Sequence, residues 1–291
     1  MRSHKSFNNI PELRTGKFFL AITLAFLFAG SVLNVSAQGN LLITPRRIVF
    51  EGNLKTAELN LANTGADTAR YNVSIVQYRM KEDGSFEEIT EPDPGQNFAD
   101  KYIRFFPRSV TLAPNEAQVV KMQLTKTNLL TPGEYRSHVY FRAVPKERAL
   151  GEEEPASDST GISVRLVPIF GITIPVIIRV GESDTKVNLS EIALDMANDT
   201  LPRLKFTFNR TGNMSVYGDI AVLHTSPSGK TTEVGIVKGI AVYTPNSLRR
   251  FQMDLKKPEG VDFHQGKLSI TFSTQSDTKP QRLAEAELIL K

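Results

Sequence analysis

The most informative stretch of this chain is Gly161-Ile-Ser-Val-Arg-Leu-Val-Pro-Ile-Phe-Gly-Ile-Thr-Ile-Pro-Val-Ile-Ile-Arg-Val180. Every even-numbered position in it is apolar, whereas the odd-numbered positions include Ser163, Arg165, Thr173 and Arg179. A period of two is typical of a β-strand with one buried face. A single strand of this length, at about 3.3 Å per residue, extends beyond a domain of ordinary size, so part of the apolar row is predicted to have no partner within the molecule.

Two prolines and a polar loop bear on how this strand is used. Pro168 and Pro175 cannot donate ladder hydrogen bonds, which predicts an edge or a bend at those points. Residues 145–160 are polar, acidic and punctuated by proline and glycine, as a loop would be. An exposed apolar edge behind such a loop favours a binding function. The alternative is two strands joined at Gly171 and buried internally, and periodicity does not decide between the two.

The rest of the chain from Leu41 onward is also predicted to form strands. Short runs rich in Val, Ile, Thr, Phe and Tyr alternate with turn residues, as they do in β-sandwiches. In one run Tyr71, Val73 and Ile75 share a face, and the Lys81-Glu-Asp-Gly84 segment that follows predicts a hairpin tip. The sequence therefore predicts an all-β protein with two consecutive immunoglobulin-like sandwiches, one over residues 38–180 and one over 181–291.

The first 37 residues form a predicted signal peptide. Basic residues ending at Lys17 precede an apolar run from Phe18 to Leu33, and Val35-Ser-Ala37 places small residues where a signal peptidase reads. A membrane anchor is the alternative, but an anchor needs about 20 apolar residues and no cleavage site. We expect cleavage after Ala37 and a periplasmic mature protein without stable membrane insertion, because no later stretch approaches a membrane span.

The composition of the chain argues against several classes of function. The 291 residues are 40% hydrophobic and 23% charged, which supports packed cores, and there is no cysteine for disulfides, thiolate metal sites or nucleophiles. Outside the signal peptide 31 basic residues face 30 acidic ones, so a nucleic-acid partner is not expected. The mature chain has only three histidines, far apart in sequence, and contains no recognisable catalytic motif. We predict a non-enzymatic protein with no catalytic residues, no metal site and no cofactor.

Several motifs resemble those of periplasmic pilus-assembly chaperones of the PapD-like class. The family's opening strand has a Thr-Arg followed by apolar residues and an acidic-Gly turn, and its next strand ends in Asn. A later segment has a proline, an apolar residue, Leu-x-Pro and then Gln before a strand, and an Arg-x-x-Pro precedes the mobile loop. In this chain they read Thr44-Pro-Arg-Arg-Ile-Val-Phe-Glu-Gly52, Lys55-Thr-Ala-Glu-Leu-Asn-Leu-Ala-Asn63, Phe105 to Val120 and Tyr140-Phe-Arg-Ala-Val-Pro145. The resemblance covers residues 41–180 by motif and the rest only by size and strand content.

The resemblance implies a mechanism. In that family the last strand of the first domain lends alternating apolar side chains to a fimbrial or pilus subunit whose fold lacks a strand, a form of β-augmentation. The residues that match the donor positions here are Ile162, Val164, Leu166, Pro168 and Phe170.

The resemblance also implies a site for the subunit's terminal carboxylate. The family holds it with an Arg of the opening strand, matched here by Arg47, and a Lys of the donor strand, whose place falls at Pro175 or Thr173. A guanidinium alone still binds a carboxylate, but the anchor is weaker without the second cation. Arg47 as a solvated strand residue is the alternative interpretation.

Two functions follow from these observations. The resemblance favours a periplasmic chaperone for fimbrial or pilus subunits. The alternative is a structural or adhesive envelope protein in which the long strand is wholly internal. The client, an outer-membrane assembly partner, and a self-dimer through the exposed edge are left open by the sequence.

Overall fold

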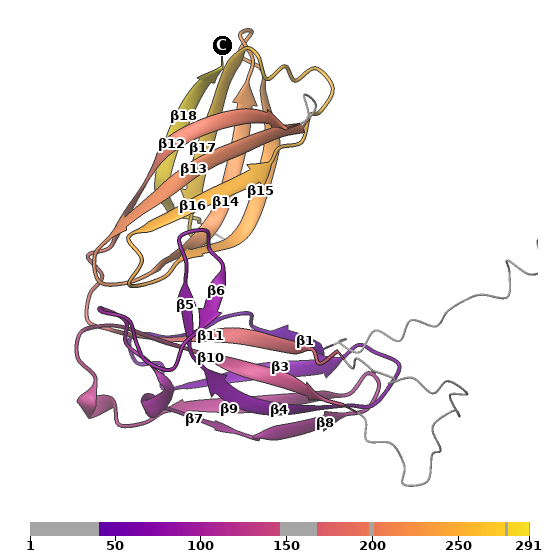
Figure 1. The fold of residues 1–291 in the computed structure, drawn as a ribbon, viewed down its shortest axis with the longest axis vertical. Coiled ribbons are helices and arrows are strands. Elements are labelled where there is room, and N and C mark those ends of the chain that lie inside the picture. The colour runs from indigo at the N-terminus through magenta and orange to yellow at the C-terminus, as the bar shows by residue number, and fades with distance from the viewer. Residues whose placement is uncertain (1–40, 146–167, 198–200, 277–278, 291) are drawn as a thin grey trace, which may run out of the picture. The chain divides into compact units, whose positions relative to one another are not determined.

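The computed structural model describes residues 41–145, 168–197, 201–276 and 279–290, and this part of the chain is built almost entirely of strands (Figure 1). Two 3-10 helices, η1 (Asp100–Tyr102) and η2 (Thr127–Leu129), are the helical elements of the described residues. The predicted signal peptide and nearly all of the predicted 145–160 loop lie outside these ranges. The predicted all-β class with two consecutive sandwiches is confirmed.

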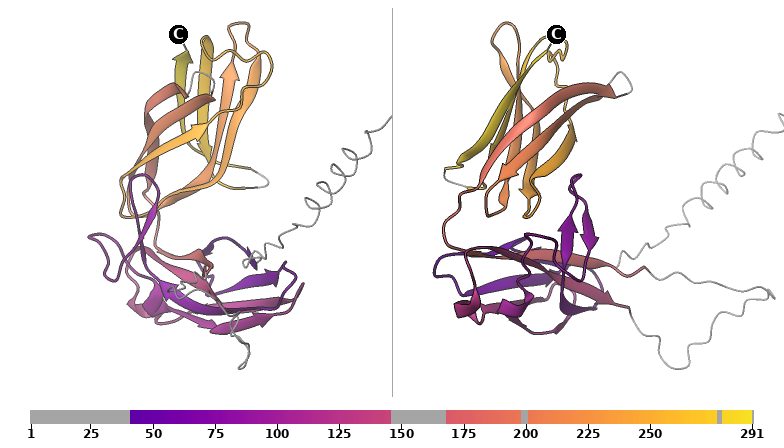
Figure 2. Two further views of the ribbon diagram at one scale, coloured as in Figure 1. Left: turned by 45° about the vertical axis from the view of Figure 1, so that its right-hand side comes forward. Right: turned by 60° about the vertical axis from the view of Figure 1, so that its left-hand side comes forward.

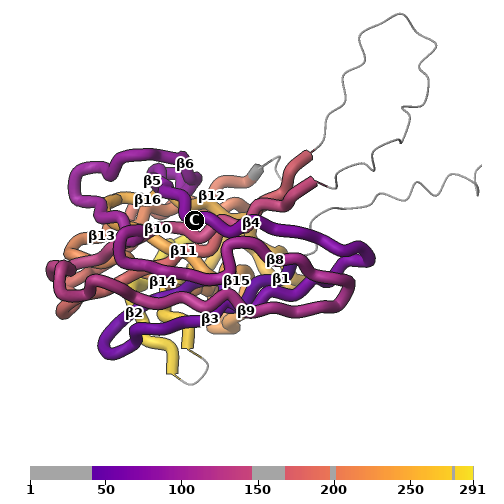
Figure 3. Tube along the Cα trace, turned by 90° about the horizontal axis from the view of Figure 1, so that it is seen from below, coloured from indigo at the N-terminus to yellow at the C-terminus, as the bar shows by residue number. Residues whose placement is uncertain are grey.

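The first sandwich, formed by strands between residues 41 and 180, has two facing sheets. One sheet has the order β1 (Leu41–Thr44), β3 (Thr56–Asn63), β9 (Ala117–Leu124), β7 (Ile103–Phe106). The other has the order β2 (Ile48–Phe50), β11 (Gly171–Val180), β10 (Gly133–Val144), β4 (Ala69–Val76), β8 (Ser109–Leu112). Figure 3 shows β3 beside β9 in the first of these sheets. The opening segment therefore changes sheets between β1 and β2.

Alternating side chains of both sheets form the core of the first sandwich. Tyr71 and Val73 of β4 are buried and Ile75 packs against them, as the sequence pattern predicts. Leu59 and Leu61 of β3 face them from the other sheet and are fully buried. Each such aliphatic side chain contributes about 1.5–3 kcal/mol on burial, so the period-two pattern is what holds the sheets together.

A small hairpin stands apart from these sheets. Strands β5 (Tyr78–Met80) and β6 (Phe86–Glu88) pair with each other, and the turn between them includes Gly84 at φ +83°. The predicted tip at residues 81–84 is therefore present. Figure 2 shows this hairpin extending away from the two sheets. Its tip contacts β16 (Leu248–Asp254) of the second sandwich, where the backbone N–H of Arg250 donates to the carbonyl of Glu82 at 2.6 Å.

The second sandwich, formed by strands between residues 186 and 290, packs a three-stranded sheet on a four-stranded one. The orders are β12 (Lys186–Ala197), β13 (Leu201–Thr211), β16 (Leu248–Asp254), and β15 (Thr231–Val242), β14 (Val216–Thr225), β17 (Gly266–Ser273), β18 (Arg282–Leu290). Phe206, Phe208 and Phe272 lie in its core. Phe208 contacts each of the other two rings edge-on, with ring centroids 5.1–5.2 Å apart.

Strands β12 and β13 are longer than the sequence indicates. Runs at 186–189 and 204–209 are the parts that alternate visibly, yet pairing extends to Ala197 and begins again at Leu201. The register shifts between Ser190 and Ala193, and Glu191 there has φ +54°. A bulge of this kind inserts a residue and changes the phase of the alternation, which hides the strand from a period-two search.

Candidate functional site

Only the carboxyl-terminal end of the predicted donor row lies among the described residues. Ile162, Val164 and Leu166 lie outside the described residues. Pro168 and Phe170 lie in the segment just before β11; the side chain of Phe170 is 47% exposed, and its carbonyl accepts a hydrogen bond from the Ala143 N–H at 2.9 Å. The described strand begins at Gly171, and the two residues before it are exposed apolar residues rather than buried ones.

Strand β11 is paired unevenly on its two edges. Along one edge β10 pairs with it from Gly171 to Val180, whereas on the other edge β2 pairs in parallel only with residues 176–178. Residues 171–175 therefore have no second strand neighbour among the described residues. Pro175, which has no N–H to donate, lies in this half-paired part, in line with the prediction that proline marks an edge.

The apolar row of β11 is divided between two environments. Ile174, Val176 and Ile178 are buried in the core of the first sandwich. Ile177 points to the opposite face and is also fully buried, in a second cluster with Met80 and with Ala241 and Tyr243 of the second sandwich. The row is thus internal from residue 174 onward, and only residues before it remain exposed.

Arg47 is the residue before β2, and it packs against aromatic residues of the second sandwich. Its guanidinium carbon lies 4.4 Å from the ring centroid of Tyr217 and 5.6 Å from that of Tyr243. Nη1 is buried and has no hydrogen-bond partner among the described residues. Burial lowers the pKa of Arg47 below its ordinary value. Arg47 is therefore not simply a solvated strand residue.

Arg136 of β10 lies at the same aromatic ring, and sequence reasoning did not identify it. Its guanidinium carbon is 4.5 Å from the Tyr243 centroid, and the residue is only 2% exposed. Nη2 donates to the Thr244 carbonyl at 3.4 Å, but Nε and Nη1 have no partner among the described residues. Burial lowers its pKa, as it does for Arg47.

A buried carboxylate two residues before Arg136 is fully bonded. Glu134 accepts hydrogen bonds from the Ser215 N–H at 3.0 Å, from the Ser215 hydroxyl at 2.7 Å and from Arg179 Nε at 3.2 Å. Ser215 belongs to the segment before β14, so this network joins the two sandwiches. Arg179 also donates to the Ser215 carbonyl at 2.8 Å, and the charge of Glu134 acts to raise the pKa of both Arg47 and Arg136 against the effect of burial.

His138 continues the polar face of β10. It is 3% exposed and packs edge-on against Tyr78 and Phe86 of the β5–β6 hairpin, with ring centroids 5.1 and 5.7 Å away. Burial, together with the nearby Arg136, lowers its pKa to about 3. His138 is therefore neutral at physiological pH and adds no positive charge to the arginines.

The resemblance places a lysine at Pro175 or Thr173, and the pairing of β11 with β10 gives the neighbours of both positions. Pro175 lies opposite His138, and Thr173 lies opposite Tyr140, in the register of β10 and β11. Arg136 is opposite Ile177, two residues along the same face from the His138–Pro175 pair. The signal that would have found Arg136 is the alternation Glu134, Arg136, His138, which puts three ionisable side chains on one face of a strand.

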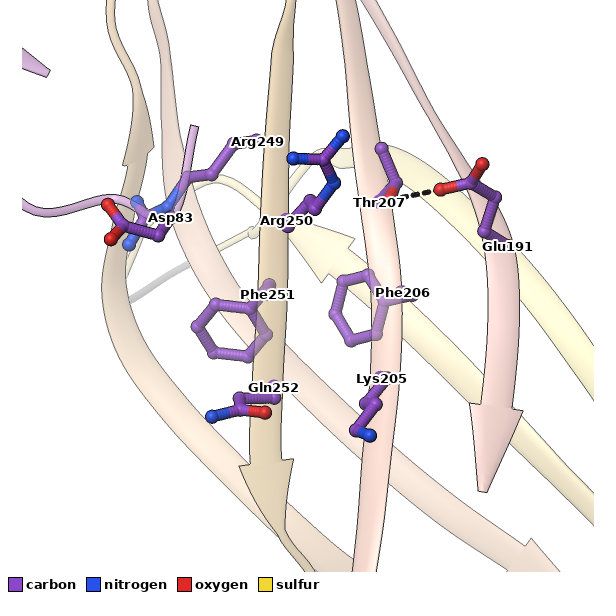
Figure 4. A pocket seen from close by; sticks show the side chains of 9 residues that line it. All are labelled: Asp83, Glu191, Lys205, Phe206, Thr207, Arg249, Arg250, Phe251 and Gln252. Atoms are coloured by element: carbon purple, nitrogen blue, oxygen red, sulfur yellow. Dashed lines mark hydrogen bonds between the residues drawn. The ribbon is translucent and has the colours of Figure 1, made fainter. Parts of the chain in front are cut away.

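A separate pocket of about 510 Å³ is lined by residues of β12, β13 and β16 and by Asp83 of the hairpin tip. Figure 4 shows the rings of Phe206 and Phe251 side by side in it and Thr207 donating to the Glu191 carboxylate. The basic side chains of the lining bond groups outside the pocket: Lys205 donates to Asp195, Arg249 to the Ala241 carbonyl and Arg250 to Glu82. In the described residues no three His, Asp or Glu side chains are grouped as metal ligands. No described helix is long and apolar enough to cross a membrane.

Comparison with known proteins gives likeness of fold. The sequence matches no family profile and no curated protein. A chain of the chaperone–tip adhesin complex of CFA/I fimbriae biogenesis is 11% identical, with a TM-score of 0.42 over 87% of this chain and 99% of that one. The YadV chaperone is 14% identical, with a TM-score of 0.41 over 87% of this chain and all of that one.

A third structure comes from an assembly complex. A chain of the CsuC–CsuE chaperone–tip adhesion subunit pre-assembly complex of Acinetobacter baumannii is 12% identical, with a TM-score of 0.42 over 86% of this chain and 98% of that one. This chain thus matches pilus chaperones of the PapD-like class over most of its length at low identity, and the likeness is one of fold.

Proposed function

We propose that this chain is a periplasmic chaperone that binds fimbrial or pilus subunits and stabilises them by donating an edge strand. The strand is β11 together with the residues before it, including the donor row Ile162, Val164, Leu166, Pro168 and Phe170. The chain acts by binding and not by catalysis. The client is a subunit with an incomplete immunoglobulin-like fold, which explains why the donor needs a free edge.

The observation that carries this proposal is the half-paired edge of β11. Residues 171–175 pair with β10 on one side and have no described strand on the other. Ile169 and Phe170, just before them, are 43% and 47% exposed. An edge with exposed apolar side chains is an aggregation hazard unless another chain covers it, so its presence supports a binding role.

The alternation of apolar residues, which is continuous in sequence from Ile162 to Ile178, supports the same mechanism. The even-numbered residues from 174 to 178 are buried in the first sandwich, so this end of the strand is fixed. The preceding even-numbered residues extend the same alternation, and they would present their side chains to one side of an incoming strand. The subunit then receives side chains for its core from a strand whose position is already set.

Hydrogen exchange on the purified mature protein tests strand donation. In the free protein we expect fast exchange at the amides of residues 168–175 that face away from β10, and protection when a candidate fibre subunit encoded beside this chain is co-expressed. Residues 176–178, held between β2 and β10, serve as the internal control and should exchange slowly in both states. Slow exchange of residues 168–175 in the free monomer would contradict the proposal.

A self-dimer that pairs through residues 168–175 gives a different hydrogen-exchange result. Protection of residues 168–175 in the free protein that disappears on dilution means that a second copy covers the edge, which agrees with an edge open to pairing. Protection that persists on dilution favours the structural or adhesive envelope protein instead. The burial of Ile174 and Ile177 is the observation that favours this second function, because it makes part of the strand internal.

A further inference from the structure

The outer face of the sheet that contains β10 and β11 is covered over only part of its length. His138, Tyr140 and Arg142 alternate along β10 and lie on this face, because the residues between them are in the core of the first sandwich. His138 lies under the Tyr78 and Phe86 rings of the β5–β6 hairpin and is 3% exposed. Tyr140 is half-buried and Arg142 is exposed. The cover that the hairpin gives thus decreases along β10, and the Tyr140 ring is partly accessible.

The Tyr140 ring lies across the neighbouring strand β11. Tyr140 is paired with Thr173 in the register, and Gly171 is its diagonal neighbour on β11. A Cβ atom added to Gly171 would lie 2.2 Å from Cε2, 2.5 Å from the hydroxyl oxygen and 2.7 Å from Cζ of Tyr140. The hydroxyl end of the ring therefore occupies the space that a side chain at position 171 would need. Tyr140 takes the place of the missing outer-face side chain at this point of β11.

The backbone of β11 under this ring faces the half-paired edge. The Ala143 N–H donates to the Phe170 carbonyl, so these two residues form a hydrogen-bonded pair of the ladder. Because such pairs alternate in an antiparallel ladder, the N–H and C=O groups of Gly171 and Thr173 point away from β10. Strand β2 pairs only with residues further along β11. A strand added to this edge would lie about 4.8 Å from β11, beside the hydroxyl end of the Tyr140 ring.

We propose that Tyr140, laid over Gly171, is a specificity contact that packs against an aliphatic or aromatic side chain of the client strand paired with the open edge of β11. The identity of the client strand rests on the proposed function. The contact lies on the face opposite to the predicted donor row, whose residues are even-numbered, so it selects the client from the other side of the sheet. Main-chain hydrogen bonds accept any extended segment, and side-chain contacts of this kind distinguish one segment from another.

Photocrosslinking separates this contact from a purely structural role, since a ring over a glycine also stabilises its own sheet. The full chain with Tyr140→p-benzoylphenylalanine is co-expressed with the candidate fibre subunit and irradiated. We expect a covalent adduct of the two chains. Arg104→p-benzoylphenylalanine is the matched control, because Arg104 is exposed on β7 of the other sheet and should give no adduct. No adduct at position 140, or equal adducts at both positions, would overturn the inference.

A double-mutant cycle tests whether Tyr140 and Gly171 act as one unit. Tyr140→Ala should weaken binding of the subunit roughly 2- to 10-fold, the range expected for one aromatic contact, and Tyr140→Phe should bind like wild type. Gly171→Ala displaces the ring and should weaken binding as well. The double variant should bind no more weakly than Tyr140→Ala, because no ring is left to displace. Losses that add in the double variant would contradict a shared contact.

A second tyrosine controls for loss of stability. Tyr102 is also half-buried, and its ring packs edge-on against Tyr135 of the same sandwich, with centroids 5.3 Å apart. Tyr102→Ala should lower the melting temperature without weakening subunit binding. If Tyr102→Ala weakened binding as much as Tyr140→Ala, the loss would follow from stability and the contact would be overturned. A subunit bound equally by wild type and Tyr140→Ala would remove the contact but leave the chaperone function standing, whereas a wild type that binds no subunit would overturn both.

Discussion

Burial sets the chemistry of individual side chains in β10. Glu134, Arg136 and His138 are each at most 3% exposed, yet they differ in how their polar atoms are satisfied. The Glu134 carboxylate has several donors, Arg136 has two orphan nitrogens, and Nδ1 of His138 has no partner among the described residues. A buried charge without a hydrogen-bond partner costs free energy, so the folded protein favours the uncharged form of His138.

His138 should make stability depend on pH. Its pKa is about 3 in the folded protein, against about 6.5 when unfolded, so between these values the unfolded chain binds the extra proton. Its contribution is complete above pH 6.5 and is lost as pH falls, at up to about 1.4 kcal/mol per pH unit. Arg136 opposes the same proton, while Tyr78 and Phe86 cover the ring without charge.

Urea unfolding of wild type and His138→Gln at pH 7.5, 5.5 and 4.5 measures this contribution. Carboxylates titrate in both proteins, so the difference between the two unfolding free energies isolates the histidine. We expect the wild type to lose more stability than the variant on acidification, by about 2.7 kcal/mol at pH 4.5. A difference that stays constant with pH would mean that His138 becomes protonated without loss of the fold.

Asn63 shows what one of the sequence motifs does physically. It is 2% exposed, and its amide nitrogen donates to the carbonyls of Asp67, Leu112 and Ala113 at 2.7–3.2 Å. Its side-chain oxygen accepts from the Gly65 N–H at 2.9 Å. One side chain therefore satisfies the backbone of two turns, and an aspartate, which only accepts, does not meet the same demand.

Strand β11 has two differently paired halves, and the proposed strand donation depends on both of them. Its second half is held between β2 and β10, while its first half has one neighbour. A strand that belongs wholly to its own core cannot be lent to another protein, and a strand without any core contact has no fixed register. The division at residue 176 meets both requirements.

Charge substitutions along this strand should give opposite results. Val164→Asp lies in the predicted donor row, so we expect a folded protein that no longer co-purifies with its subunit. Ser163→Asp is the matched control on the alternate face and should keep both properties. Ile174→Asp should unfold the protein, because Ile174 is 4% exposed in the core. Circular dichroism melting and co-purification measure these outcomes, and unfolding of Val164→Asp would favour the structural alternative.

Strands with a strict alternation of apolar and polar residues could be predicted from the sequence, and a strand interrupted by a bulge could not. The buried row from Ile174 to Ile178 and the face of Tyr71 and Val73 follow from the period of two. The second half of β12 was missed because the bulge at Glu191 changes the phase. Arg47 was identified through its resemblance to a family motif, whereas no motif pointed to Arg136, whose partner ring, Tyr243, is more than one hundred residues away in sequence.

At the scale of the whole molecule, the described contacts between the sandwiches are of two strengths. The Arg250–Glu82 ion pair at 2.6 Å is exposed, with 67% and 56% of the two side chains accessible, and such pairs contribute little, about 0–1 kcal/mol. Glu134 is buried and accepts two bonds from Ser215 of the second sandwich. The Glu134 network is therefore expected to couple the two sandwiches far more than the ion pair at the hairpin tip.

Glu134→Gln tests this coupling. Removing the buried negative charge leaves Arg47, Arg136 and Arg179 without their nearest counter-charge, and breaking such a network costs about 3–5 kcal/mol. Because Glu134 lies in β10 and its acceptor bonds reach Ser215, we expect differential scanning calorimetry to show one transition for wild type and two separated transitions for the variant. Arg250→Ala is the control and should melt like wild type. If both variants melted alike, the sandwiches would be coupled by apolar contacts such as Ile177 with Tyr243, and not by charge.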